Sequence, residues 1–256
     1  MQGDLAFADS GGPAGAVTLL LVHPMGADRR FWDACVAVWR GRYRCIAVDL
    51  RGCGASPAAQ GAIPVPDHAS ALAAFITRHG FGPVVPVGCA VGAMIATALA
   101  GMQGDLTRAL VVSNPGTATQ PGARAALRDR AEQVRKGGMQ AVIPAAIDIA
   151  FAGCRPDAAR QVWAERFAAL DPAAYALQIE GILDAEITPF LAAIACPTLI
   201  VAGGQDRLLQ PDHARLIHRA LPQSELAEVP DGAHFIPYQR PAEFAGLVSG
   251  FLDRVL

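Results

Sequence analysis

One segment of this sequence has the residue types and spacing of a catalytic turn. Residues 85–94 read VPVGCAVGAM, an apolar run that leads through two glycines directly into a helical pattern. Gly88 and Gly92 flank Ala90 in the spacing G-x-X-x-G, which is typical of the strained strand-to-helix turn that exposes a nucleophile. Small residues must surround the apex, because strand and helix approach closely there. The pattern predicts that residue 90 faces a reacting carbonyl; an ordinary strand-to-helix turn is the alternative.

An acid and a histidine follow this turn in the order that such chemistry needs. Asp206 comes just after the apolar run 197–203, and His234 comes just after the run 225–230. A carboxylate at the end of a strand can orient an imidazole, which then acts as a general base. Taken alone, His234 is better explained as a surface or helix-capping histidine. Together with the turn, the order predicts a catalytic triad of position 90, Asp206 and His234.

The residue at the apex is the wrong one for this chemistry. The methyl group of Ala90 has no lone pair, so it cannot attack a carbonyl. Cys89 stands one position early, and its side chain is expected to point away from His234. One explanation is a serine-to-alanine change, such as an engineered inactivation, in a hydrolase whose site is otherwise intact. The other is a natural pseudo-hydrolase that binds without cleaving. The first is favoured here, because the acid, the base and the small residues are all kept.

Alternating strand and helix patterns must position these residues. Most of the apolar runs lack a period of two, as expected for strands that are buried on both faces of a parallel sheet. The alternation predicts an α/β fold with a mostly parallel, doubly wound sheet. The predicted strands are 16–23, 43–50, 84–89, 108–113, 197–203 and 225–230, and the predicted helices between them are 31–39, 66–79, 92–102, 211–220 and 241–256.

A long helical segment interrupts the alternation. Residues 116–195 contain no convincing strand, and about 80 residues are too many for a single crossover connection. Glycine and proline divide the segment into helical blocks at 121–136, 139–151, 156–170 and 172–185. We therefore predict a core made of residues 1–117 and 196–256, with a helical cap inserted at 118–195.

Composition excludes several classes of protein. The 256 residues are 52% hydrophobic and 17% charged, which excludes a disordered chain. A net charge of −2 without a basic run argues against nucleic-acid binding. We expect neither a secretory signal in residues 1–12 nor a membrane span, and six cysteines without a CxxC pair indicate a cytoplasmic protein. Neither a metal-ligand spacing nor a GxGxxG fingerprint is present, so we predict no metal and no cofactor.

These residues resemble the α/β-hydrolase-fold enzymes of the esterase, lactonase and C–C hydrolase branch. The matching motifs are HPMG at 23–26, DLRGCGAS at 49–56, GCAVG at 88–92 and GAHFIP at 232–237. Within the branch, the chain is most similar to 3-oxoadipate enol-lactonases and related small-molecule hydrolases. It departs from their pattern at Pro24, where glycine is commoner, at Ala233, where glycine usually precedes the base, and at Ala90, where serine is expected.

The resemblance implies a serine hydrolase that cleaves a small-molecule carboxylic ester or lactone. Amide and C–C bonds stay open as alternatives, because the same triad cleaves them. The backbone N–H groups of Met25 and Val91 are expected to form the oxyanion hole. The side chains expected to contact substrate are His23, Trp32, Trp163 and Phe235. A small molecule is the expected partner, and a homodimer is one possible assembly.

The cap is expected to cover this site. Its residues Trp163, Phe167, Tyr175, Ile179 and Leu183 have spacings that could form an inward face, although packing against the core explains most of them equally well. One of the cap arginines could pair with a substrate carboxylate, but a solvated helix face is the default expectation for all of them. These arginines are Arg124, Arg128, Arg130 and Arg135.

Overall fold

The computed structural model describes residues 4–154 and 156–256. In this part of the chain, seven strands form one sheet in the order β1-β3-β2-β4-β5-β6-β7. All neighbouring strands are parallel except β1, which pairs with β3 in the antiparallel sense. The strands are β1 (Phe7–Asp9), β2 (Thr18–Val22), β3 (Arg44–Val48), β4 (Val85–Cys89), β5 (Leu110–Ser113), β6 (Thr198–Gly203) and β7 (Ser224–Val229). The predicted α/β class and its mostly parallel sheet are confirmed.

The sequence patterns missed one strand and two short helices. Strand β1 has three residues, which are half-buried or exposed, so no apolar run marks it. Helices α8 (Thr188–Leu191) and α10 (Ile236–Gln239) have four residues each, too few to show a helical period. The stretch 1–12, in which the sequence predicts no secretory signal, begins with three residues that lie outside the described part. Within the described part, no helix is long and apolar enough to cross a membrane.

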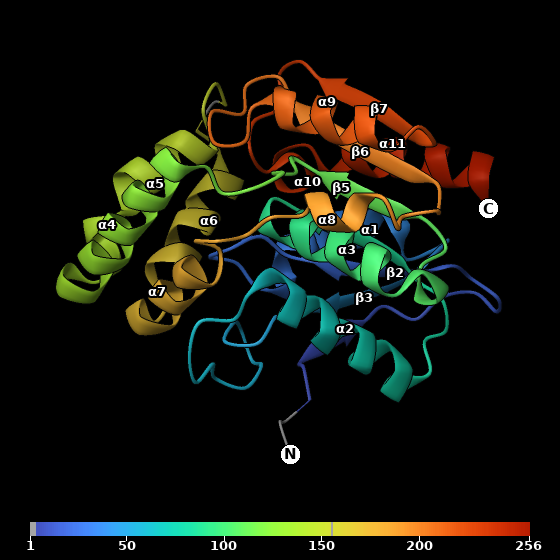
Figure 1. The fold of residues 1–256 in the computed structure, drawn as a ribbon, viewed down its shortest axis with the longest axis horizontal. Coiled ribbons are helices and arrows are strands. Elements are labelled where there is room, and N and C mark those ends of the chain that lie inside the picture. The colour runs from blue at the N-terminus through green and yellow to red at the C-terminus, as the bar shows by residue number, and fades with distance from the viewer. Residues whose placement is uncertain (1–3, 155) are drawn as a thin grey trace.

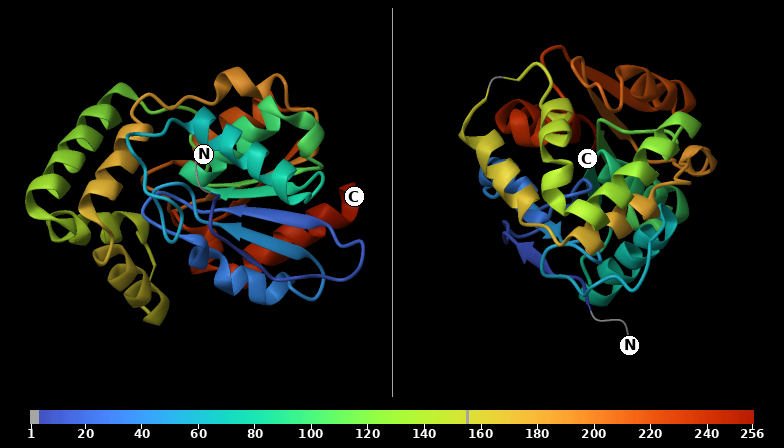
Figure 2. Two further views of the ribbon diagram at one scale, coloured as in Figure 1. Left: turned by 90° about the horizontal axis from the view of Figure 1, so that it is seen from below. Right: turned by 90° about the vertical axis from the view of Figure 1, so that its left-hand side faces the viewer.

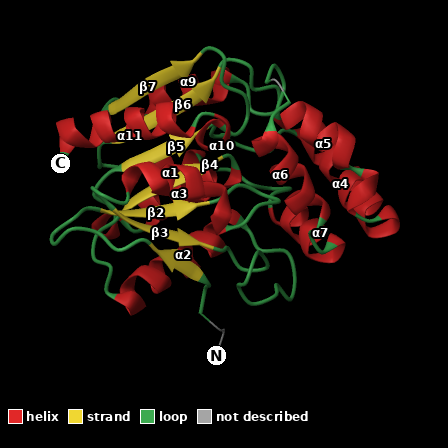
Figure 3. Ribbon diagram, turned by 180° about the vertical axis from the view of Figure 1, so that it is seen from behind, coloured by secondary structure: helices red, strands yellow, loops and turns green. Residues whose placement is uncertain are grey.

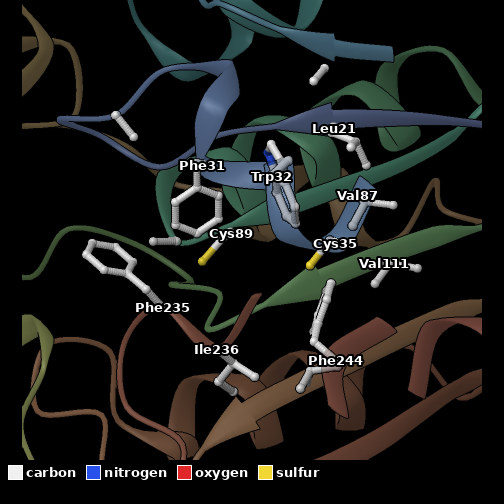
Figure 4. Close-up of a cluster of buried hydrophobic side chains, with 14 of the residues drawn as sticks. Leu21, Phe31, Trp32, Cys35, Val87, Cys89, Val111, Phe235, Ile236 and Phe244 are labelled. Carbon is white, nitrogen blue, oxygen red and sulfur yellow. The ribbon is translucent and has the colours of Figure 1, made fainter. Parts of the chain in front are cut away.

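Helices cover both faces of the sheet (Figure 1). On one face, α1 (Asp33–Trp39) and α11 (Pro241–Val255) pack on a core that includes Leu21, Val87 and Phe244 (Figure 4). On the other face, α2 (Val65–His79), α3 (Val91–Met102), α8 and α9 (Pro211–Ala220) pack on a core that includes Leu20 and Val112. Residues 20 and 21 therefore point to opposite faces, and both are buried, which explains the absence of a period of two.

Four further helices form a separate group beside the sheet. They are α4 (Pro121–Gly137), α5 (Ile143–Ala150), α6 (Ala158–Ala168) and α7 (Pro172–Gly181). Figure 2 shows them standing apart from the helices that flank the sheet, and in Figure 3 the arrowheads of the parallel strands point toward them. Because parallel strands carry functional residues at their carboxyl ends, this group, which we call the cap, faces the edge where a site is expected.

The six cysteines differ in burial, and this gives a testable difference in reactivity. Cys35, Cys45, Cys53 and Cys89 are buried, whereas Cys154 and Cys196 are half-buried. Burial raises the pKa of the Cys53 thiol to about 12 and that of Cys45 to about 11. Since the thiolate is the reactive form, we expect an aromatic disulfide reagent to modify Cys154 and Cys196 first, and the other four only after unfolding. Peptide mass mapping checks this order, and rapid modification of Cys89 in the folded protein would contradict it.

Candidate active site

The tight turn at the end of β4 is built from three small residues. Ala90 has φ 52° and ψ −115°, a conformation that costs a non-glycine residue about 1–3 kcal/mol. Its N–H donates to the Ser113 carbonyl oxygen at 2.9 Å, which ties the apex to β5. A Cβ atom on Gly88 would lie 2.2 Å from the Gly92 carbonyl oxygen, and one on Gly92 would lie 2.2 Å from the Val22 carbonyl oxygen. Glycine is therefore required on both sides of Ala90.

Asp206 and His234 come together at the ends of β6 and β7. The Nδ1 atom of His234 lies 2.9 Å from Oδ2 of Asp206, and both side chains are buried. The other carboxylate oxygen, Oδ1, accepts the N–H groups of Leu208 and Leu209 at 2.8 and 3.0 Å. A carboxylate only accepts hydrogen bonds, so we assign the ring proton to Nδ1. This tautomer leaves a lone pair on Nε2, the form that a general base needs.

The surroundings of Asp206 keep it ionised. Burial opposes its negative charge, but the electrostatic attraction and hydrogen bond of the His234 ring, the Leu209 N–H and the Asn114 side chain together outweigh burial. They hold the pKa of the Asp206 carboxyl below its ordinary value. Asp206 therefore carries a negative charge at neutral pH and can stabilise a protonated imidazole.

Asn114 belongs to this arrangement, and the sequence analysis missed it. Its Nδ2 donates to Asp206 Oδ2 at 2.9 Å and to the Ala233 carbonyl oxygen at 3.0 Å. The Ser113 hydroxyl donates to its Oδ1 at 2.8 Å, which fixes the orientation of the amide. Asn114 has φ 49°, a left-handed conformation that asparagine tolerates better than most residues. An asparagine directly after a buried strand was the available signal.

We expect Asn114→Ala to lower the free energy of unfolding by about 2–4 kcal/mol at pH 7, because it removes the Asn114 donor from the buried Ala233 carbonyl oxygen and leaves the charged Asp206 Oδ2 with the His234 donor but without the Asn114 donor. The variant also raises the pKa of Asp206 in the folded protein. A folded-state pKa below the unfolded value of about 3.9 stabilises the protein above that pH, and this contribution is lost as the pH falls. The cost of Asn114→Ala should therefore shrink below about pH 4.

Urea unfolding at several pH values measures this cost. Ser70→Ala is the matched control, because it removes an exposed side-chain hydrogen bond to the Pro66 carbonyl oxygen. The control should cost less than about 0.5 kcal/mol at every pH. A cost for Asn114→Ala that is equally small, or independent of pH, would contradict the role assigned to Asn114.

A cavity of about 330 Å³ lies between the turn and the cap. Ala90 and His234 line it from the core, and α4, α5, α6 and α7 line it from the cap. Its wall is mostly apolar, which is typical of small-molecule sites. The structure thus places position 90 and His234 at one cavity, with Asp206 held behind the histidine.

Met25 and Val91, the residues expected to form the oxyanion hole, both line this cavity. Val91 is the first residue of α3, so its N–H has no acceptor within the helix. The Met25 N–H makes no hydrogen bond within the described residues. The next N–H along the loop, that of Gly26, donates to Gln178 Oε1 of α7 at 2.9 Å. A cap residue therefore fixes the loop that carries Met25.

Of the four residues expected to contact substrate, two line the cavity and two do not. Trp163 and Phe235 line the cavity, with ring centroids 4.6 Å apart. His23 and Trp32 do not line it, which corrects the prediction for both. His23 is fully buried, where its Nε2 accepts the Leu50 N–H at 3.0 Å and its Nδ1 faces the Pro24 carbonyl oxygen at 2.8 Å. Trp32 is buried against Phe244 (Figure 4). His23 therefore holds the backbone at Leu50, and Trp32 belongs to the core.

The cap residues expected on an inward face also divide into those that line the cavity and those that do not. Phe167 and Tyr175 line the cavity, but Ile179 and Leu183 do not. Cys89 is buried among apolar side chains of the core (Figure 4), and its Sγ lies 3.7 Å from the backbone carbonyl oxygen of His234. Burial raises the pKa of the Cys89 thiol well above its ordinary value, so Cys89 is a poor substitute nucleophile. Among the residues that the structure describes, no group of three or more His, Cys, Asp and Glu side chains could hold a metal ion.

Comparison of the sequence with known proteins finds a matching family model and similar relatives. The family model described as "Alpha/beta hydrolase family" matches residues 19–247. A putative carbamate hydrolase RutD of Klebsiella pneumoniae is 28% identical over 231 residues, which cover 86% of this chain and 85% of the relative. The 3-oxoadipate enol-lactonase 1 of Acinetobacter baylyi is 24% identical over 99% of this chain and 95% of its own length.

Solved structures show the same architecture. A thermophilic esterase from Thermogutta terrifontis, with malate bound, superposes with a TM-score of 0.89 at 27% identity, over 98% of this chain and 93% of that one. The enol-lactonase from Burkholderia xenovorans superposes with a TM-score of 0.88 at 22% identity, over 97% and 96% of the two chains. At that lower identity, the likeness concerns the fold alone.

Proposed function

Since the chain belongs to the alpha/beta hydrolase family, we propose that its site is built to hydrolyse a small-molecule carboxylic ester or lactone, with Ala90 in the place of the nucleophilic serine of a Ser-His-Asp triad. The observation that carries this proposal is the Asp206–His234 pair, whose histidine shares a cavity with the apex of the turn. The names of the relatives, a carbamate hydrolase and an enol-lactonase, also describe cleavage of a bond to an acyl carbon.

With serine at position 90, the chemistry follows from the site. The serine Oγ attacks the acyl carbon while His234 Nε2 takes the hydroxyl proton. The N–H groups of Met25 and Val91 bind the oxyanion. His234 then gives its proton to the departing alkoxide, which leaves an acyl-enzyme. A water molecule, deprotonated by His234, attacks the acyl carbon. His234 then returns this proton to the serine Oγ as the acid is released.

With alanine at position 90, this covalent route is closed. The chain as it stands then binds an ester or lactone without acylation, either as a serine-to-alanine variant or as a natural binding protein that never cleaved. Ala90 itself favours this second candidate function. Hydrolysis of amide or C–C bonds by the same triad is a further alternative, because the triad does not select the bond.

The test compares the unmodified chain with Ala90→Ser on aryl esters, lactones, anilides and β-diketones. Turnover by Ala90→Ser on esters or lactones supports the proposal. Turnover on anilides or β-diketones instead would show that the site cleaves amide or C–C bonds. A folded Ala90→Ser that is inert on every class, together with tight ligand binding by the unmodified chain, favours the binding protein.

A further inference from the structure

The basic residues of cap helix α4 differ in their partners. Three have a carboxylate within ion-pair distance: Arg124 pairs with Asp184, Arg135 with Glu180, and Lys136 with Glu132. Within the described residues, Arg128 and Arg130 have no carboxylate partner. Arg128 is exposed, so water can solvate its charge. Arg130 instead lines the cavity, where solvation is poorer.

Two aromatic rings hold Arg130 in this position. Its Cζ atom lies 5.4 Å from the ring centroid of Tyr175 and 6.0 Å from that of Phe167. The two rings meet edge to face at 5.2 Å. The Nε atom of Arg130 is buried and has no hydrogen-bond partner among the residues that the structure describes. Cation–π contacts position a guanidinium, but they leave its hydrogen-bond donors unused.

The cavity wall supplies no negative charge for these donors. Among the described residues that line the cavity, Arg130 is the one that is permanently charged, and none of the others is Asp or Glu. Placing a cation in an apolar wall without a partner costs free energy, and the low polarity strengthens its attraction to an anion. A guanidinium matches a carboxylate with two parallel hydrogen bonds.

Arg130 also lies close to the loop expected to bind the substrate carbonyl. A Cβ atom built on Gly26 would lie 2.8 Å from Cε2 of Phe167 and 3.1 Å from Cε2 of Tyr175. The two rings that hold Arg130 therefore also contact the residue beside Met25. A ligand with its carbonyl at Met25 and an anionic group at Arg130 would therefore lie across these two rings.

We infer that Arg130 is the specificity residue of this cavity, and that the ligand is an ester or lactone with a carboxylate a few carbon atoms from its acyl carbon. This inference rests on the proposed function. It differs from the expectation that all the cap arginines lie on a solvated face, because that expectation holds for Arg128 and fails for Arg130.

Calorimetric titration of the unmodified chain tests the inference. The probes are monomethyl succinate, monomethyl glutarate and monomethyl adipate, each compared with the neutral compound in which a carboxamide replaces the carboxylate. We expect at least one half-ester to bind about 10- to 100-fold more tightly than its amide, the effect of a charge-assisted pair. Arg130→Gln should reduce this ratio to within about twofold, whereas Arg128→Gln, on the same helix, should preserve it.

The outcomes separate this inference from the proposed function. If half-esters and amides bind the unmodified chain equally, or if Arg130→Gln leaves the preference unchanged, the role of Arg130 is wrong while an ester site remains. If no probe binds, charged or neutral, the proposed function falls as well. Arg130→Lys keeps the charge but loses the two parallel donors, so an intermediate ratio is expected. It replaces Arg130→Gln if that variant does not fold.

Discussion

Ala90→Ser is expected to raise the rate of ester or lactone hydrolysis by about 10⁵–10⁶-fold, because removal of the serine from a well-studied serine protease costs about that much. Serine meets the same φ of 52° that alanine already tolerates, so the fold should be unaffected. Ala90 lines the cavity with His234, so the new hydroxyl should face the same cavity as the imidazole. Initial rates for aryl acetates and small lactones, compared with the unmodified chain, measure the gain.

Double variants show whether the gain comes from a triad. His234→Ala in the Ala90→Ser background should return the rate to that of the unmodified chain, because members of a triad act as a unit. Asp206→Asn in that background should lower the rate about 10⁴-fold, since the amide favours the wrong tautomer of His234. A gain that survives His234→Ala would contradict the mechanism.

The last variant is His234→Ala with Ala90 kept. If no nucleophile is present, removal of the imidazole should not change the rate of hydrolysis. A slow rate in the unmodified chain that His234→Ala abolishes would show instead that His234 activates water directly, and the serine step would no longer be needed.

Gly92→Ala is expected to destabilise the fold by about 4 kcal/mol or more, a large share of the 5–15 kcal/mol that stabilises a typical domain. Its Cβ would lie 2.2 Å from the Val22 carbonyl oxygen and 2.6 Å from that of His23. Both are backbone atoms at the end of β2, so no side chain can rotate to make room. Helix α3 would have to move away from the sheet.

Gly246→Ala is the matched control for this change. Gly246 lies in the middle of α11, is exposed, and would place a Cβ atom with no other atom within 4 Å. It should raise the free energy of unfolding by about 0.5–1 kcal/mol, through helix propensity alone. Urea unfolding followed by circular dichroism compares the two variants. A Gly92→Ala protein as stable as the parent would show that the turn is not as tight as the structure indicates.

The sequence alone determined which segments form strands and helices. It also determined the order of the nucleophile position, the acid and the base along the chain. Strands β2 to β7 and the long helices have apolar patterns that are properties of neighbouring residues, so they can be found without knowing what packs against them. The turn at 88–92 could be recognised for the same reason, because its two glycines are required by contacts between adjacent elements. Asp206 and His234 were found because each follows a strand.

Only the tertiary structure decided which side chains meet. Asn114 joins Asp206 across 92 positions of sequence, and no local period encodes that contact. His23 belongs to a conspicuous motif and Trp32 follows it closely in the sequence, yet both side chains are buried in the core and do not line the cavity. Arg128 and Arg130 are equivalent by composition and stand two positions apart on one helix. About 200° of helical rotation separates them, so one faces water and the other faces the cavity, and the direction of that rotation is set by packing between α4 and α7.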